Sequence, residues 1–353
     1  MPSKVRVRDL ARLAGVSPST VSRVLNGTAQ VSPEVQARVR NAAMETGFKL
    51  ENSNRTKLIA FLLSNRDLLH PFHSRVLVGA EAFCSANNYS VIFLPFHYRA
   101  DVPWQDLHLP KILQRRDQIS GFVIAGTNSQ NLFDLLSSKQ IPFAVLGNNV
   151  LEDWKSNEYD TVWVDDEQGA YEMTRHLQAI GHRDIWFVGN CKFTWFARLH
   201  NGYRRAMEEA GLAPRNAGFD FEQEENVGYL GAKSIFTSGE SATAIFAGTD
   251  VCADGVYKAL RDLNVRVPEE VTVVGCDDLD AVKLYPPLTT IRVFGEQVGA
   301  HLSELVLNRI AQPDRPVQKY TIPTQLIKRE SSGPPPRFSG RTAEFDSSSI
   351  TNA

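Results

Sequence analysis

Residues 8–27 of the chain, RDLARLAGVSPSTVSRVLNG, combine the signals of two short helices joined by a tight turn. Apolar side chains recur at the spacing of one helix face, at Leu10, Leu13 and Ala14. Gly15 can adopt the positive φ that a sharp turn requires. Ser17 then supplies a side-chain oxygen for the N-cap of a second helix, and Pro18 is its first residue, where a missing N–H is harmless. The pattern is typical of a helix-turn-helix.

The second helix of this pair has two contrasting faces. Its apolar face comprises Val21, Val24 and Leu25, and its polar face comprises Ser19, Thr20, Ser22, Arg23 and Asn26. Short polar side chains beside an arginine suit hydrogen bonding to base edges in a major groove. A small helical hairpin with a solvated face is the alternative, but the caps, the turn and the polar face all agree with the motif. We therefore favour DNA binding.

A third helix is expected next, with Ser32 as its N-cap, Pro33 as its first residue and Gly47 at its end. Three short helices in fifty residues predict a self-contained headpiece. Residues 1–50 hold eight basic and three acidic residues, a net charge of +5, whereas the whole chain has a net charge of −2. The rest of the chain therefore carries −7, and this split suits a headpiece that meets DNA phosphates.

The 353-residue chain is long enough to bury a sizeable core beyond the headpiece. It contains neither the apolar region of a signal peptide nor an apolar run of membrane length, so we expect a cytoplasmic protein without membrane contact. Its four cysteines are far apart and its eight histidines lack metal-ligand spacing, so neither a disulfide framework nor a metal site is expected. Phosphate-binding, dinucleotide-binding, zinc-protease and serine-hydrolase motifs are absent from the sequence, so no cofactor and no enzymatic activity are predicted.

From residue 58 onward, strand-like and helix-like segments alternate. Nine apolar runs predict strands, at residues 58–63, 91–94, 121–125, 143–146, 161–164, 185–188, 244–247, 271–275 and 288–293. Amphipathic helical stretches lie between most of them, which predicts parallel sheets flanked by helices. Nine strands are many for one such sheet, so we expect two α/β lobes. The tail at residues 331–353, rich in Ser, Pro and Gly, is expected to be disordered.

Taken together, these segments resemble the LacI/GalR family of bacterial transcription regulators, from about residue 5 to residue 333. Besides the headpiece motif, the matching stretches are VSPEVQARVRNAAMETGF at 31–48, HPF at 70–72, VDDEQGAYEMTRHLQAIGHRDIWFVG at 164–189, GYRRAMEEAGL at 202–212, residues 244–293 and KRESSG at 328–333. The headpiece and the segment VVGCDDLDAVKLYPPLTTI at 273–291 are the most specific of them, and their order and separation match the family.

The resemblance implies a three-helix headpiece at residues 1–48, a linker at 49–57 and a two-lobed body at 58–330, like that of periplasmic sugar-binding proteins. Lobe 1 would comprise about 58–160 and 291–320, and lobe 2 about 161–290 and 321–330. The chain in such bodies crosses between the lobes three times, here near residues 159–162, 290–293 and 320–323. A homodimer is also implied, because one headpiece reads only half of a palindromic operator.

The resemblance also assigns residues of the headpiece to double-stranded DNA. Pro18 and Ser19 fall on the base-reading pair of the family, and Pro18 can offer only apolar contact, for example to a thymine methyl. Arg23 suits either a guanine or a phosphate. Arg6 stands where relatives carry a helix-capping residue, so a phosphate contact is expected there. The predicted DNA-binding set is Arg6, Ser17, Pro18, Ser19, Thr20, Ser22, Arg23, Asn26 and Gln30.

The linker departs from the family pattern. Relatives carry a hinge helix whose leucine enters the minor groove of the operator. The sequence KLENSNRTK at 49–57 is shorter than the linker of relatives and lacks this motif, and its NSNR segment is a poor helix former. We therefore do not expect the leucine wedge and its DNA kink in this chain.

A small effector is expected between the lobes, outside the carboxyl ends of the strands. Asp277 matches a family position that bonds effector hydroxyls, and the alternative is a helix N-cap; Thr249 and Asp250 match a second strand-end pair with the same alternative. Arg198 is the neighbour of the position, Leu199, where relatives place an arginine, so either Arg198 replaces it or the ligand lacks that contact. The predicted effector set is His70, Phe72, His73, Trp195, Arg198, Thr249, Asp250 and Asp277.

Alternative roles are open to several of these side chains. Trp195 is expected to stack on a sugar face, with core packing as the alternative, and the two histidines would otherwise lie in an exposed loop. A solute-binding protein for uptake would share the body but carry a signal peptide and no headpiece. An enzyme would need a base or nucleophile beside Asp277 and Asp278, and none is evident.

The sequence therefore predicts a transcription regulator, specifically a repressor, controlled by a small polar effector such as a sugar. The alternatives within the same family are an activator, or a regulator whose effector acts as corepressor. Arg23→Ala is expected to abolish operator binding, and Asp277→Ala to abolish the effector response.

Overall fold

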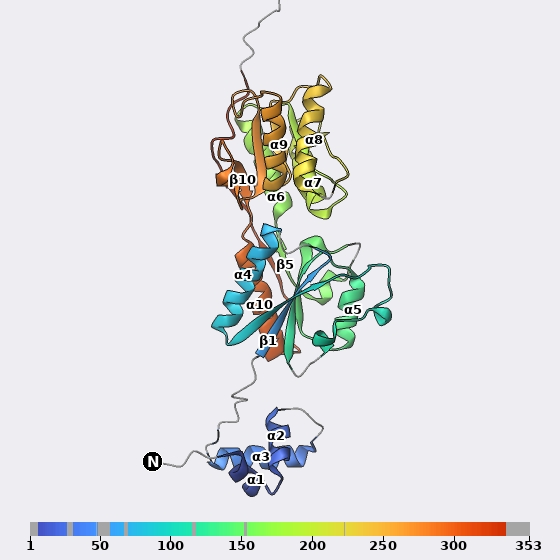
Figure 1. The fold of residues 1–353 in the computed structure, drawn as a ribbon, viewed down its shortest axis with the longest axis vertical. Helices are drawn as coiled ribbons and strands as arrows, with labels where there is room; N and C mark the ends of the chain where they lie inside the picture. The colour runs from blue at the N-terminus through green and yellow to red at the C-terminus, as the bar shows by residue number, and fades with distance from the viewer. Residues whose placement is uncertain are drawn as a thin grey trace, which may run out of the picture.

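The computed structural model describes residues 6–26, 31–46, 48, 57–66, 70–114, 118–151, 154–221 and 223–336. A small helical headpiece and two α/β lobes follow one another along the long axis (Figure 1). The linker as far as residue 56, Gln30, Gly47 and the tail from residue 337 lie outside the described residues. Within the described part of the chain, no helix has both the length and the apolar character needed to cross a membrane.

The headpiece consists of α1 (Val7–Ala14), α2 (Pro18–Asn26) and α3 (Pro33–Thr46), so the three predicted helices are confirmed. Gly15 ends α1 with a φ of 63°, as the turn requires. The Ser17 hydroxyl accepts the Thr20 N–H at 3.1 Å and caps α2. The headpiece has its own small apolar core, formed by Leu10, Ala11, Ala14, Val21, Val39, Ala42 and Ala43.

Lobe 1 is built on a parallel sheet with the strand order β11-β5-β4-β3-β1-β2. Its strands are β1 (Lys57–Ser64), β2 (Tyr89–Phe96), β3 (Ile119–Gly126), β4 (Phe143–Leu146), β5 (Asp160–Val164) and β11 (Lys319–Ile322). Its helices are α4 (Pro71–Ala86), α5 (Gln130–Ser138) and α10 (Gly295–Ala311). Alternate residues of β1 face two different cores, one shared with α4 and α10 and the other with α5, because successive side chains of a strand point to opposite faces.

The backbones of α4 and α10 touch where they cross. A Cβ atom added to Gly79 would lie 1.9 Å from the Glu296 carbonyl oxygen, and one added to Gly299 would lie 1.9 Å from that of Val76. Only glycine permits this approach, so the long C-terminal helix α10 is held tightly on lobe 1.

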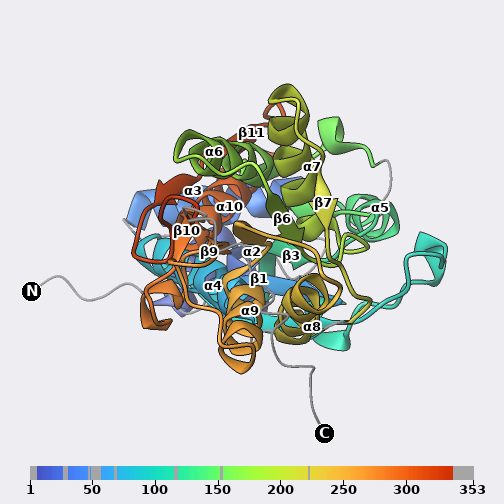
Figure 2. The same ribbon diagram turned by 90° about the horizontal axis from the view of Figure 1, so that it is seen from above.

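Lobe 2 repeats the arrangement, with the strand order β12-β10-β9-β8-β6-β7. Its strands are β6 (Ile185–Val188), β7 (Arg215–Asn216), β8 (Ala244–Ala247), β9 (Thr272–Asp277), β10 (Thr289–Arg292) and β12 (Gln325–Ile327), all parallel except β12. Its helices are α6 (Asp166–Ala179), α7 (Thr194–Glu209), α8 (Glu224–Thr237) and α9 (Asp250–Asp262). Seen from above, α6 and α7 lie on one side of the sheet and α8 and α9 on the other (Figure 2).

The two-lobed α/β fold predicted from the sequence is confirmed, and all nine predicted strands are present. Three further strands, β7, β11 and β12, were not predicted, because they are short edge strands with mostly exposed or half-buried side chains. The first crossing also differs from its predicted place at residues 159–162. That segment belongs to β5, which pairs with β4 in lobe 1, so the chain crosses only after Val164.

The C-terminal boundary of the body needs a second correction. The predicted disordered tail begins at residue 331, yet Ser331 is fully buried. Its hydroxyl donates to the Val273 carbonyl at 2.6 Å and accepts the Thr289 N–H at 2.8 Å. The Gly333 carbonyl lies 2.8 Å from Nε2 of His182. Residues 331–333 therefore close lobe 2, because their polar groups complete hydrogen bonds of buried strands.

A buried ion pair ties α10 to β5. The Asp160 side chain is 1% exposed, and Arg309 donates to its two oxygens from Nε and Nη2, each at 3.0 Å. The Gln318 N–H adds a third bond at 2.8 Å. The carboxylate is thus fully enclosed, and it depends on Arg309 for its compensating charge.

Arg309→Met is expected to lower the free energy of unfolding by about 3–5 kcal/mol, because it leaves a buried carboxylate unpaired while keeping the aliphatic stem. Chemical denaturation of the full chain measures the change. The matched control is Arg99→Ala, which removes the exposed Arg99–Asp101 pair and is expected to leave the free energy of unfolding nearly unchanged, because solvent screens an exposed ion pair. Equal, small effects of both variants would contradict this prediction.

Candidate functional site

The headpiece presents α2 with an exposed polar surface. Pro18, Ser19 and Arg23 are exposed, and Thr20 is half-buried. The Ser17 hydroxyl lies 2.7 Å from that of Ser19 and 2.8 Å from that of Thr20, so these hydroxyls form one cluster at the start of α2. A helix N-terminus with hydroxyls and a nearby arginine offers donors to phosphates and base edges alike.

Arg6, for which a phosphate contact is predicted, begins α1. Its backbone N–H donates to Oδ2 of Asp9 at 2.9 Å, so Asp9 supplies the reciprocal part of the cap. The Arg6 guanidinium has no acceptor atom, so it cannot cap the N–H groups of α1. Asn26 is the last residue of α2.

A cavity lies between the two lobes. Lobe 1 contributes the segments that follow β1, β4 and β5, and lobe 2 contributes the start of α6, the first turns of α7 and the ends of β8 and β9. The residues that line it are Arg66, His70, Phe72, His73, Leu146, Asn148, Asn149, Val164, Asp166, Trp195, Arg198, Leu199, Thr249, Cys276, Asp277 and Val293. All predicted effector residues except Asp250 are among them.

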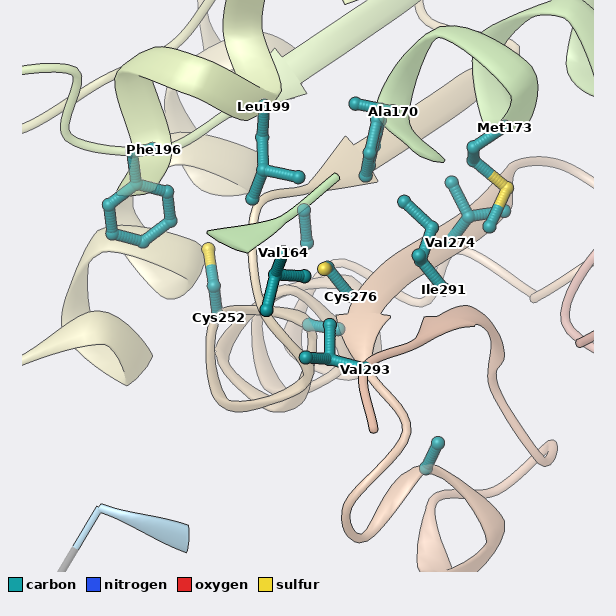
Figure 3. Packing of buried hydrophobic residues seen from close by; sticks show 14 of the residues in the cluster. Val164, Ala170, Met173, Phe196, Leu199, Cys252, Val274, Cys276, Ile291 and Val293 are labelled. Atoms are coloured by element: carbon teal, nitrogen blue, oxygen red, sulfur yellow. The ribbon is translucent and has the colours of Figure 1, made fainter. Parts of the chain in front are cut away.

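The floor of the cavity is apolar. Val164, Leu199, Cys276 and Val293 lie close together there (Figure 3). They belong to the buried core that runs from the end of β5 to α7 and β9. Polar side chains stand around this floor, an arrangement typical of small-molecule sites.

Asp277 is the most unusual polar group of the cavity. It ends β9 with a φ of 114°, a conformation that a non-glycine residue rarely adopts. Within the described part of the chain, no donor bonds to its carboxylate. Burial, together with the charges of Asp250, Glu224 and Asp166, raises the pKa of Asp277 well above its ordinary value. Such a strained, unpaired carboxyl group is suited to bonding a ligand hydroxyl.

Arg198 is held by an extensive network. Its guanidinium donates to both oxygens of Asp166, with Nη2 to Oδ2 at 2.7 Å and Nε to Oδ1 at 3.0 Å. It also donates to the Asn148 carbonyl and, at 3.3 Å, to Oδ1 of Asn149. Both asparagines belong to a 3-10 turn of lobe 1, Gly147–Asn149, so Arg198 connects the lobes.

This network shows where Arg198 lies, and its contact with a ligand stays a prediction. The side chain does reach the cavity from a position next to that of the family arginine, while Leu199 is buried in the cavity floor. Because Asp166 pairs with the guanidinium in a bidentate manner, most of its charge is compensated within the protein.

Trp195 lies in the cavity wall with other groups over its ring. The Phe193 ring is stacked on it with centroids 4.6 Å apart, and Cζ of Arg66 lies 4.0 Å from the indole centroid. Both Phe193 and Arg66 therefore pack against the indole ring. The indole Nε1–H is buried and has no partner among the described residues. Trp195 therefore offers an N–H to the cavity, and its stacking on a sugar face stays a prediction.

The two histidines occupy different environments. Nδ1 of His70 accepts the Phe72 N–H at 3.3 Å, which places the proton on Nε2, and Nε2 lies 3.7 Å from Oε2 of Glu224 in lobe 2. His73 is 1% exposed, and burial lowers its pKa to about 3, so its imidazole is neutral. Neither residue lies in an exposed loop.

Asp250 is the one predicted effector residue that does not line the cavity. It begins α9 and is buried behind the wall, where Oδ1 accepts the Thr290 hydroxyl at 2.6 Å and Oδ2 accepts the Leu279 N–H at 3.0 Å. Burial raises the pKa of Asp250 to about 7. Its carboxyl group joins α9 to β10 and to the segment after Asp277, so it is a positioning residue.

Thr249 caps a helix and also lies at the cavity. Its hydroxyl caps α9 by accepting the Cys252 N–H at 3.0 Å, and the same oxygen donates to Oε2 of Glu224 at 2.8 Å. The residue also lines the cavity.

Four polar residues of the cavity were not predicted from the sequence, namely Arg66, Asn148, Asn149 and Asp166. Each follows the end of a strand, β1, β4 or β5, at the carboxyl edge of the lobe 1 sheet. The rule that pointed to Asp277 would have found them, had it been applied to every parallel strand.

Comparison with known proteins agrees with this architecture. Residues 6–50 match the family model of bacterial regulatory proteins of the lacI family, and residues 174–332 match that of the periplasmic binding protein-like domain. The chain is 31% identical over 343 residues to the HTH-type transcriptional repressor PurR of Haemophilus influenzae, covering 92% of this chain and 98% of that protein. It is 29% identical over 340 residues to the ribose operon repressor of the same species, with the same coverage.

Among solved structures, a LacI family transcriptional regulator from Enterococcus faecium with bound ribose is similar, with a TM-score of 0.66 and 25% identity over 78% of this chain and 99% of that one. The relatives are DNA-binding regulators, so the prediction that this chain is not an enzyme is confirmed. With its helix-turn-helix headpiece and its two-lobed body around one polar cavity, the chain belongs to the lacI family of bacterial regulatory proteins.

Proposed function

We propose that this protein is a transcriptional repressor that binds a palindromic operator as a homodimer and changes its operator affinity when a sugar occupies the cavity between the lobes. The observation that carries the proposal is the cavity itself. It draws residues from both lobes, and it presents the unpaired Asp277 carboxyl group and the unpartnered Trp195 N–H over an apolar floor. These groups match ring hydroxyls and the apolar face of a sugar.

DNA recognition is assigned to the headpiece. Its net charge of +5 attracts phosphates, and α2 carries the exposed side chains for the major groove. One headpiece covers a half-site, so two copies are needed for a palindrome. We also propose a cytoplasmic location, because a DNA-binding regulator acts where its operator lies.

Effector control requires that the ligand bind two states of the protein with different affinity. The cavity suits this requirement, since Arg198 of lobe 2 bonds Asn148 and Asn149 of lobe 1 beside it. A ligand that strengthens or breaks such contacts changes the relative position of the lobes, and with it the spacing of the two headpieces.

Selection from a library of palindromic DNA tests the proposal. The purified full chain is incubated with the library at fixed salt, alone and with pooled sugars, and bound DNA is sequenced. We expect one enriched palindrome whose dissociation constant changes at least about fivefold with one sugar pool, in line with usual allosteric coupling energies. If the bound DNA shows no sequence preference, either without sugar or with any of the sugar pools, the operator assignment is refuted.

A further inference from the structure

The space between the lobes has two compartments. The inner cavity described above opens next to a larger vestibule. Three side chains, Arg66, His70 and Trp195, line both compartments. They therefore stand at the boundary, and any ligand that reaches the inner cavity from the vestibule has to pass them.

The first contact at this boundary joins Arg66 to Trp195. Arg66 lies two residues beyond β1 of lobe 1, and Trp195 lies in the first turn of α7 in lobe 2. The guanidinium carbon is 4.0 Å from the indole centroid, a close cation–π contact. Phe193, which lines only the vestibule, is stacked on the same indole with ring centroids 4.6 Å apart.

The second contact joins His70 to Glu224. His70 is the N-cap of α4 in lobe 1, and Glu224 is the first residue of α8 in lobe 2. Nε2 of His70 lies 3.7 Å from Oε2 of Glu224. The Glu224 side chain is 8% exposed, and Thr249 holds the same oxygen at 2.8 Å, so the acceptor is firmly positioned.

We infer that Arg66, Trp195, His70 and Glu224 form a clasp that closes the inner cavity over an uncharged ligand the size of one sugar ring. The clasp occupies the path that a second ring would need, so it excludes disaccharides. This inference rests on the proposed function, because it specifies which sugars that site accepts.

The charges around the inner cavity support an uncharged ligand. Asp166 neutralises Arg198, and the neutral His73 contributes no charge. Asp277 has no cationic partner among the described residues, and its raised pKa reflects its burial and its nearness to three other carboxyl groups. A phosphate or carboxylate on the ligand would meet this acidic group in a site where Arg198 is already paired with Asp166 and Arg66 lies over the Trp195 ring, which is unfavourable in a buried environment.

Isothermal titration calorimetry on the full chain tests the inference. The panel comprises ribose, glucose, galactose and fructose, the disaccharides cellobiose, lactose and sucrose, and the 6-phosphates of glucose and fructose. We expect one monosaccharide to bind, and disaccharides and phosphates to bind at least about tenfold more weakly, because steric exclusion and charge repulsion both act in the closed site. A disaccharide or a sugar phosphate that binds as tightly as the best monosaccharide would overturn the inference and leave the proposed function intact. If no sugar binds, the proposed function fails, and this inference with it.

Arg66→Ala opens the clasp without touching the cavity floor. The monosaccharide dissociation constant is expected to rise about 2- to 30-fold, the range of one cation–π contact, while disaccharides gain affinity. The matched control is Arg99→Ala, an exposed arginine of lobe 1 paired with Asp101, which should leave the whole panel unchanged. If Arg66→Ala raises the dissociation constants of all sugars by the same factor, the preference for monosaccharides over disaccharides is unchanged and the role of the clasp is overturned.

Trp195→Phe provides a second test that preserves packing. It removes the indole N–H and reduces the surface beneath Arg66, so it is also expected to narrow the difference between one-ring and two-ring ligands. An unchanged thermal unfolding midpoint shows that the fold is intact. If Trp195→Phe has an intact fold and keeps the wild-type preference for one-ring over two-ring sugars, the clasp is contradicted.

Discussion

Arg23→Ala is expected to weaken operator binding by at least about 30-fold and to leave sugar binding unchanged. A bidentate arginine–guanine contact contributes about 1–3 kcal/mol, and a dimer on a palindrome loses two of them. Arg23 is exposed on α2. The opposite, apolar face of α2 packs against α1 and α3 through the buried Val21. The substitution therefore removes a contact without disturbing the headpiece core. Fluorescence anisotropy with the selected operator measures the effect, and calorimetry checks the sugar.

Arg40→Ala is the matched control for this prediction. Arg40 is an exposed arginine of α3 in the same headpiece, so both variants lose one positive charge and both lower the salt dependence of binding. Only Arg23→Ala should also reduce the preference for the selected sequence over random DNA. Loss of sugar binding together with DNA binding would indicate misfolding, and equal effects of both arginines would contradict base reading by Arg23.

Asp277→Asn is expected to weaken sugar binding by about 10- to 150-fold and to abolish the effector response, while operator binding persists. Hydrogen bonds to charged groups contribute about 1.5–3 kcal/mol, and the amide is isosteric with the carboxylate. Asparagine also tolerates the φ of 114° better than alanine, so this variant separates chemistry from backbone strain. Calorimetry with the bound sugar and operator titration with and without it provide the measurement.

The stability of this variant supplies an independent readout. Burial and neighbouring carboxyl groups raise the pKa of Asp277 in the folded protein, so its contribution to stability is complete below the ordinary value of 3.8 and is lost as the pH rises through the raised value. Asp277→Asn should therefore raise Tm, and more so at higher pH. If the Asp277 carboxylate stabilised the fold, Asp277→Asn would lower Tm instead. Asp280→Asn, on the exposed segment three residues away, should change neither Tm nor sugar binding.

Local chemistry made the headpiece predictable. Each of its helices begins or ends at a residue whose own preference sets the boundary, such as Gly15 with its positive φ and Ser17 with its capping oxygen. The central strands were predictable for a similar reason, because a strand buried on both faces is a continuous apolar run. The edge strands β7 and β11 lack such runs, since one of their sides meets solvent.

The cavity was predictable only in part. Asp277 ends the apolar strand β9, and Thr249 lies two residues beyond the apolar strand β8, so their place at a carboxyl edge could be inferred from the chain order. Nothing local distinguishes Asp250 from a ligand-binding aspartate, and only its bonds to Thr290 and the Leu279 N–H show that it is a positioning residue.

The amino-acid sequence alone is enough to establish the helix-turn-helix, the alternation of strands and helices and the family, because all three depend on neighbours along the chain. The contact of Arg66 with Trp195, the bond of Arg198 to the Asn148 carbonyl and the approach of His70 to Glu224 depend instead on how two lobes meet. Their partners are separated by many residues, and each lobe is assembled from separate segments of the chain. Tertiary packing therefore decides which strand-end side chains face each other, and so which ligand the cavity can hold.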